Sequence, residues 1–184
     1  MALNFTEKEF ENRKNKTLTS MKEQNIDALL MFKQESMYWL TGYDSFGFVF
    51  FQTLILKNDG EIILLTRAPD LRQAQNTSNI KNIIIWEDEE TSSPTDLLKN
   101  ILVDLKLNGK NIGIEYDSYG LNGRNALKLN NSLKDFEAIN DKSELISNLR
   151  VIKSNEEIVY IKIAAVLADN ALDIVWKTVK AGVD

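Results

Sequence analysis

The strongest constraint on the fold is a pair of apolar runs separated by a tight turn. The runs are FVFFQTLILK (48–57) and EIILLT (61–66), with the turn Asn58–Gly60 between them. Asn, Asp and Gly favour the backbone angles that a short β-hairpin needs. The pattern therefore predicts two antiparallel strands, with Phe50 and Phe51 in the core.

The rest of the chain alternates between short apolar runs and amphipathic stretches. Short apolar runs are typical of buried strands, whereas a period near 3.6 indicates helices. The expected strands lie at 26–32, 80–86, 110–117 and 136–141, and the expected helices at 7–24, 34–43, 68–75, 92–107, 120–133 and 143–150. This alternation, combined with one hairpin, predicts an α/β domain with a mixed β-sheet and helices on both faces.

The sequence closes with a long predicted helix, from Asn155 to Lys180. Ser154 and Glu157 have the capping-box spacing, in which each side chain bonds a backbone N–H group of the first turn. Gly182 is a suitable stop, and a helix of this length spans about 40 Å. Periodicity leaves two interpretations open: a terminal helix packed on the core, or a linker helix leading into further sequence.

Two residue types that carry much enzyme chemistry are missing. The 184 residues include no histidine and no cysteine, so the chain cannot build a serine–histidine triad or a cysteine–histidine pair. The net charge is −5 with both signs spread along the chain, so we expect no nucleic-acid partner. No apolar run is long enough to span a bilayer, so we expect no membrane partner and a cytoplasmic location.

Carboxylates remain as candidate catalytic groups. The four acids Glu87–Glu90 lack the ligand spacing of a calcium loop, so we interpret them as a solvated turn. Glu115 and Asp117 follow the apolar run Ile112–Ile114, and residues two apart on a strand face the same side. A paired acid–base or metal role is one hypothesis for these two residues, and loop capping or ion pairing is the other.

An aromatic loop precedes the hairpin. YDSFGFVFF (43–51) places Tyr43, Asp44, Phe46 and Phe48 beside a glycine. Such a loop either packs against its own domain or reaches into a ligand pocket or another surface.

Two arginines, Arg67 and Arg72, flank the short segment 68–71 in the middle of the chain. Arginine is suited to bidentate carboxylate recognition, which makes both residues candidate carboxylate-binding groups. An ordinary surface ion pair is the alternative for each.

Three segments resemble the creatinase/prolidase/aminopeptidase P family. LRVIKSNEEIVYIKIAAVLADNAL (149–172) is similar to the segment that joins the two domains of that family. MYWLTGYD (37–44) resembles the family's YLTG segment, and IGIEYDSYGL (112–121) resembles a later strand-and-helix element. The three segments occur in the family's order and cover nearly the whole chain.

The resemblance implies a creatinase/prolidase-type N-terminal domain at 1–150, with a ribonuclease H-like fold. Residues 151–184 would form the linker and first helix of a catalytic pita-bread domain that is not present in this chain. The family's two divalent metal ions belong to that catalytic domain, so no catalytic residue, metal ligand or cofactor is expected here. The domain would serve dimerisation and substrate selection in a metal-dependent Xaa-Pro peptidase or related C–N hydrolase, including enzymes that act on creatine-like amides.

The same resemblance gives the aromatic loop a role. The family's loop after YLTG can reach the active site of a neighbouring subunit. Tyr43, Asp44, Phe46 and Phe48 are therefore candidate substrate contacts in a neighbouring subunit.

Two other classes of function stay open. One is a stand-alone protein- or peptide-binding module without enzymatic activity, and the other is a small enzyme that uses Glu115 and Asp117. The peptidase-domain hypothesis predicts an uncovered apolar face on the last helix, at Ile161, Ala165 and Leu172.

Overall fold

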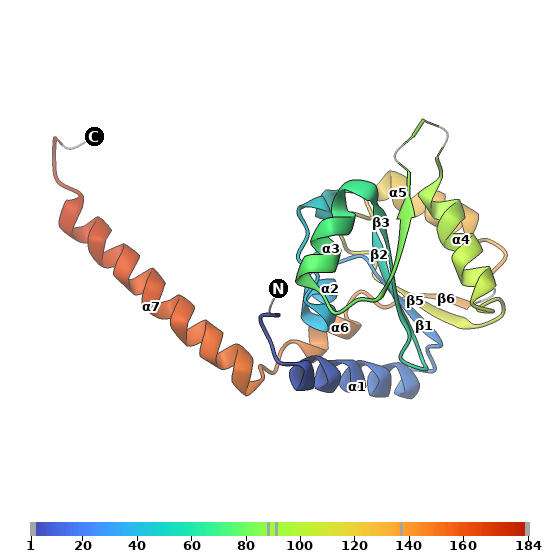
Figure 1. Ribbon diagram of the computed structural model, residues 1–184, viewed down its shortest axis with the longest axis horizontal. Coiled ribbons are helices and arrows are strands. Elements are labelled where there is room, and N and C mark those ends of the chain that lie inside the picture. Colours follow the sequence, from blue (N-terminus) through green and yellow to red (C-terminus); the bar gives the residue numbers. More distant parts are fainter. Residues whose placement is uncertain (1–2, 88, 91, 137, 183–184) are drawn as a thin grey trace. The chain divides into compact units, whose positions relative to one another are not determined.

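The computed structural model describes residues 3–87, 89–90, 92–136 and 138–182. The chain divides into two units, Met1–Leu149 and Arg150–Asp184. The first unit contains the sheet and the helices around it, and the second contains one long helix, α7 (Asn155–Thr178) (Figure 1).

A six-stranded mixed sheet forms the centre of the first unit. Its strands are β1 (Ala28–Met31), β2 (Thr53–Lys57), β3 (Ile62–Arg67), β4 (Asn82–Trp86), β5 (Asn111–Ile114) and β6 (Ala138–Asp141). They lie in the order β4-β3-β2-β1-β5-β6. β2 runs antiparallel to both neighbours, whereas β1–β5, β3–β4 and β5–β6 are parallel pairs. The carboxyl ends of five strands therefore lie at one end of the sheet, and the amino end of β2 lies there too.

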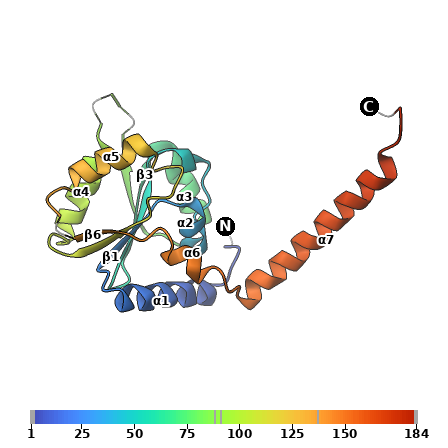
Figure 2. The same ribbon diagram turned by 180° about the vertical axis from the view of Figure 1, so that it is seen from behind.

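Helices cover both faces of the sheet, which confirms the predicted fold class (Figure 2). The helices are α1 (Glu7–Glu23), α2 (Gln34–Thr41), α3 (Leu71–Thr77), α4 (Pro94–Asp104), α5 (Gly123–Ser132) and α6 (Leu145–Leu149), with the 3-10 turns η1 (Phe46–Val49) and η2 (Ala68–Asp70). Leu102 of α4 and Leu129 of α5 belong to the core cluster on one face. Met21 of α1, Leu40 of α2 and Ile146 of α6 belong to the cluster on the other face.

The turn residues of the hairpin act as predicted, and a side-chain cap starts the first helix. Gly60 has a φ of +89°, and the Lys57 N–H group donates to the Glu61 carbonyl at 3.0 Å, which closes the β2–β3 hairpin. At the start of α1 the Thr6 hydroxyl accepts a hydrogen bond from the Glu9 N–H group at 3.2 Å. These bonds satisfy backbone groups that a turn or a first helical turn leaves unpaired.

The strand predicted to begin at Phe48 begins later, at Thr53. Residues 46–49 form η1 instead, and Phe50 is 44% exposed, so its predicted place in the core is wrong, whereas the burial of Phe51 is confirmed. The reason lies at Gly120, where a Cβ atom would come within 2.9 Å of the Phe50 carbonyl oxygen. The segment packs its backbone against this glycine rather than against a strand.

Helix α7 begins with the predicted capping box. The Ser154 N–H group donates to Glu157 Oε2 at 2.7 Å, and the Glu157 N–H group donates to Ser154 Oγ at 3.2 Å. The helix ends at Thr178, two residues before the predicted Lys180, and none of its residues is buried. Within the described residues, no helix has the length and apolar character to cross a membrane.

Candidate functional site

Exposed aromatic side chains gather at the end of the sheet where the parallel strands have their carboxyl ends. Phe46, Phe48, Val49 and Phe50 come from η1 and the residue after it, and Tyr119 follows β5. The exposed fraction is 87% for Phe46, 39% for Phe48, 44% for Phe50 and 78% for Tyr119. The rings of Phe48 and Tyr119 meet edge to face with centroids 6.0 Å apart, which joins the two segments. We call these five residues, four aromatic side chains and the aliphatic Val49, the aromatic surface.

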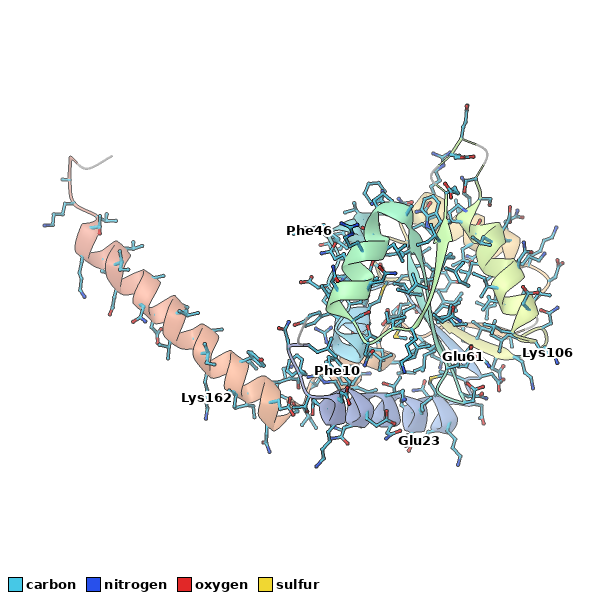
Figure 3. The ribbon with its side chains drawn as sticks, viewed as in Figure 1. Phe10, Glu23, Phe46, Glu61, Lys106 and Lys162 are labelled. Atoms are coloured by element: carbon cyan, nitrogen blue, oxygen red, sulfur yellow. The ribbon has the colours of Figure 1, made fainter. Side chains whose placement is uncertain are left out.

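Figure 3 labels Phe46 at the outside of the first unit, at the opposite end of the sheet from Glu61. Glu61 immediately precedes β3, so the aromatic surface and the hairpin turn lie at opposite ends of the strands. A large exposed apolar patch is uncommon on a monomeric soluble protein and marks an interaction or ligand site.

Two glycines fix the turn that carries the surface. A Cβ atom on Gly47 would lie 2.5 Å from Asp70 Oδ1, and one on Gly120 would lie 3.1 Å from the Phe48 carbonyl oxygen. Side chains at these positions would force the turn away from its support. The Gly47 N–H group also donates to Ser45 Oγ at 2.8 Å, which closes the turn locally.

Arg67 holds the same turn from the end of β3. Its Nε atom donates to Asp70 Oδ2 at 3.0 Å, and its guanidinium carbon lies 3.5 Å from the centre of the Phe50 ring. Asp70 is 6% exposed. The Arg67 guanidinium therefore neutralises a buried carboxylate and stacks on an aromatic ring, while Arg72 is exposed on α3.

Buried polar groups lie beneath the turn. The Tyr43 hydroxyl donates to Gln52 Oε1 at 2.9 Å, and the Thr66 hydroxyl donates to the same oxygen at 3.2 Å. Gln34 Nε2 donates to the Tyr43 carbonyl at 2.7 Å, which ties the loop to the first residue of α2. Burial raises the pKa of the Tyr43 hydroxyl, so it stays protonated and keeps donating.

Glu115 completes this polar support at the end of β5. It is 0% exposed, and its carboxylate accepts hydrogen bonds from the Phe32 and Lys33 N–H groups and from the Ser36 hydroxyl, at 3.1, 3.0 and 2.6 Å. It thereby joins the end of β1 and the first turn of α2 to β5. Burial raises the pKa of Glu115 to about 7. We call Tyr43, Gln52, Thr66 and Glu115 the buried polar layer.

Of the two hypotheses for Glu115 and Asp117, the paired acid–base or metal role is wrong, and loop capping by Glu115 and ion pairing by Asp117 are confirmed. β5 ends at Ile114, before either residue, so strand alternation does not align them. The Asp117 side chain is 84% exposed and lies 3.5 Å from Lys33 Nζ. Among residues 3–87, 89–90, 92–136 and 138–182, no group of three His, Cys, Asp or Glu side chains could hold a metal ion. Of the acidic run Glu87–Glu90, Asp88 lies outside the described residues and the other three acids are exposed.

The structure separates the four predicted contact residues. Asp44, Phe46 and Phe48 are exposed, whereas Tyr43 is fully buried. The sequence analysis misses Tyr119, although a signal for it exists. Loops that follow parallel strands lie at the same end of the sheet, so an aromatic residue soon after the second strand lies near the loop after the first. It also misses Asp70, because nothing local marks this residue as the buried partner of Arg67.

A family model described as the Creatinase/Prolidase N-terminal domain matches residues 13–152. Among curated proteins, the ectoine hydrolase of Halomonas elongata is 30% identical over 89% of this chain and 43% of its own length. An uncharacterized hydrolase/peptidase of Sinorhizobium fredii is 27% identical over 92% of this chain and 45% of its own length. The chain therefore spans less than half of these relatives.

Solved structures share the fold. A prolidase from Thermococcus sibiricus matches 94% of this chain and 45% of its own with a TM-score of 0.79 and 21% identity. An Xaa-Pro dipeptidase from Bacillus anthracis matches 95% of this chain and 45% of its own with a TM-score of 0.75 and 18% identity. At these identities the likeness establishes the architecture.

Proposed function

The chain belongs to the creatinase/prolidase N-terminal domain family, and from that premise we propose that it is the non-catalytic N-terminal domain of a metal-dependent Xaa-Pro peptidase or related C–N hydrolase. Its roles in that enzyme are oligomerisation and substrate selection. The names of the relatives include both Xaa-Pro dipeptidase and ectoine hydrolase, so membership of the family leaves the substrate open.

The observation that carries the substrate-selecting role is the aromatic surface. Its rings stay exposed because two glycines and Arg67 hold the turn, and because the Tyr43 hydroxyl anchors the preceding loop on Gln52. Rigid aromatic side chains at the rim of a pocket exclude water and select a substrate by shape. We assign Asp44, Phe46 and Phe48 as contacts at the active site of a neighbouring subunit, with Tyr43 as their support.

Helix α7 supports the presence of a second domain in the enzyme. Ile161 and Leu172 of this helix are 50% and 55% exposed, and Ala165 is also exposed. Apolar helix residues of this kind need a covering surface. We assign that surface to the catalytic domain of the same polypeptide.

The metal ions of the proposed hydrolase are assigned to that catalytic domain as well. The part of the chain that the structure describes brings together no three candidate ligands, so these residues do not fit a metal centre. In such hydrolases the metal supplies an activated water for attack on the amide carbonyl. This chain contributes shape and position.

The test is substrate discrimination by the polypeptide that the whole gene encodes. The ratio of kcat/KM for an Xaa-Pro dipeptide to that for ectoine is measured in the wild type and in Phe46→Ala. Leu127→Ala is the matched control, because Leu127 is 74% exposed on α5. We expect Phe46→Ala to change the ratio about tenfold, since one apolar contact in a pocket discriminates by about that factor.

Equal ratios in Phe46→Ala and Leu127→Ala would remove the substrate-selecting role and leave the enzyme assignment in place. A whole-gene product that hydrolyses neither of these substrates nor creatine, with divalent metal supplied, would favour a stand-alone binding module. Hydrolysis by residues 1–184 alone would contradict a non-catalytic domain.

A further inference from the structure

One edge of the sheet lacks the features that usually protect an edge strand. β4 is the end strand of the sheet and pairs with β3. In the described ranges, the backbone of β4 is hydrogen-bonded to β3 and to no other segment. Its centre, Ile83–Ile85, is half-buried and contains no charge and no proline. Natural proteins place charges, prolines or bulges on such edges because unpaired N–H and C=O groups recruit another strand.

The opposite edge has a different character. β6 is one residue shorter, and its last two residues, Asn140 and Asp141, are exposed. Lys142 follows directly. Polar and charged side chains therefore limit the apolar part of this edge to Ala138 and Ile139. The contrast points to β4 as the edge that is built to pair.

We propose that β4 pairs with β4 of a second copy of this chain, antiparallel about a two-fold axis through Ile84. In this register Ile83 lies opposite Ile85 of the second copy, and Asn82 lies opposite Trp86. One step further out, Lys81 lies opposite Glu87 of the second copy, and both side chains are exposed. The two-fold axis generates each of these pairs twice.

Charge selects this arrangement over the parallel one. A parallel in-register pair would place Lys81 against Lys81 and Glu87 against Glu87. Like charges directly across a strand pair destabilise it, whereas opposite charges stabilise it. The antiparallel register centred on Ile84 therefore satisfies the backbone groups of the edge, the apolar side chains and the flanking charges together.

The proposed contact leaves the aromatic surface free. Trp86 pairs with Arg67, so the carboxyl end of β4 lies at the same end of the strands as the aromatic surface. An antiparallel pair directs these ends away from one another in the two copies. This inference rests on the oligomerising role proposed above and assigns that role to one strand.

The test is a charge swap at the two flanking positions, measured by sedimentation of residues 1–184 over a range of concentrations. Lys81→Glu places two glutamates opposite one another, and Glu87→Lys places two lysines opposite one another. We expect each single variant to dimerise about tenfold more weakly than the wild type. The double variant carries both swaps, restores opposite charges and should recover wild-type dimerisation.

Mixing the two single variants gives a stricter result. A chain with glutamate at both positions and a chain with lysine at both positions complement one another, so the mixture should form a heterodimer more strongly than either variant self-associates. Lys110→Glu is the matched control, because Lys110 is exposed and lies outside β4 and its flanking residues. It should dimerise like the wild type.

The possible failures are distinguishable. A dimer that responds equally to Lys81→Glu and to Lys110→Glu would overturn the β4 contact and leave the oligomerising role in place. A chain that stays monomeric at every concentration, including as the whole-gene product, would overturn both.

Discussion

The buried polar layer and the aromatic surface lie at the same end of the strands, yet each contains a tyrosine that has the opposite environment. Tyr43 is 0% exposed and donates its hydroxyl proton to Gln52, whereas Tyr119 is 78% exposed and contributes an edge-to-face contact with Phe48. Burial makes the first tyrosine a stability element, because an unsatisfied buried group is costly. Exposure frees the second for recognition. Matched substitutions in the two regions test this division.

The largest contrast is expected between two neighbouring carboxylates. Glu115→Ala removes the acceptor of three hydrogen bonds and leaves a cavity, so we expect it to lower the free energy of unfolding by about 3 to 4 kcal/mol. Asp117→Ala removes an exposed carboxylate, and we expect a change of about 0.5 kcal/mol or less. Urea unfolding of residues 1–184 measures both. Equal losses in the two variants would show that the division into buried and exposed regions does not govern stability.

The next effect is a dependence of stability on pH that belongs to the buried polar layer alone. Burial raises the pKa of Glu115 from 4.5 to about 7. The folded state therefore holds this proton more tightly, so the stabilising contribution is full below pH 4.5 and is lost as the pH rises through about 7. We expect the free energy of unfolding to fall by about 2 to 3 kcal/mol between about pH 5 and pH 8.

The background for this measurement is favourable, because the chain contains no histidine or cysteine to titrate in the same range. Glu115→Gln keeps the shape of the side chain and removes its titration, so its stability should vary little over this pH range. A slope that survives in Glu115→Gln would assign the effect to another group.

The smallest contrast uses an identical change in each region. Tyr43→Phe deletes the hydroxyl that bonds Gln52, and we expect a loss of about 1 kcal/mol, since Thr66 still donates to the same oxygen. Tyr119→Phe deletes an exposed hydroxyl and should leave stability within about 0.5 kcal/mol of the wild type. Thermal unfolding of both variants gives the comparison. A larger loss in Tyr119→Phe would reverse the roles of the two tyrosines.

The fold was predictable because its signals are local. Turn residues at Asn58–Gly60 and the capping box at Ser154 mark where elements begin and end, and the structure confirms them. The candidate site was only partly predictable, because its arrangement depends on contacts between distant segments. Nothing near Phe50 in the sequence indicates that Arg67 stacks on its ring, or that its carbonyl oxygen packs closely against Gly120.

The same limit applies to the two carboxylates after β5. The assumption of strand alternation placed Glu115 and Asp117 on one side, but the strand stops at Ile114. Glu115 turns inward because backbone N–H groups at Phe32 and Lys33 need an acceptor there. Those donors lie more than eighty positions earlier in the chain, so pattern analysis of the local segment cannot find them.

The position of β1 in the sheet sets an order of events during synthesis. The β2–β3 hairpin closes over a short loop, but Leu30 of β1 lies beside Ile114 of β5, far along the chain. Closing so long a loop is slow compared with forming a hairpin. All four residues of β1 are buried in the finished sheet. A nascent chain that has not yet reached β5 therefore exposes the side of this apolar strand that β5 later covers. The interval between the synthesis of β1 and that of β5 is therefore when this protein most needs protection from association with other chains.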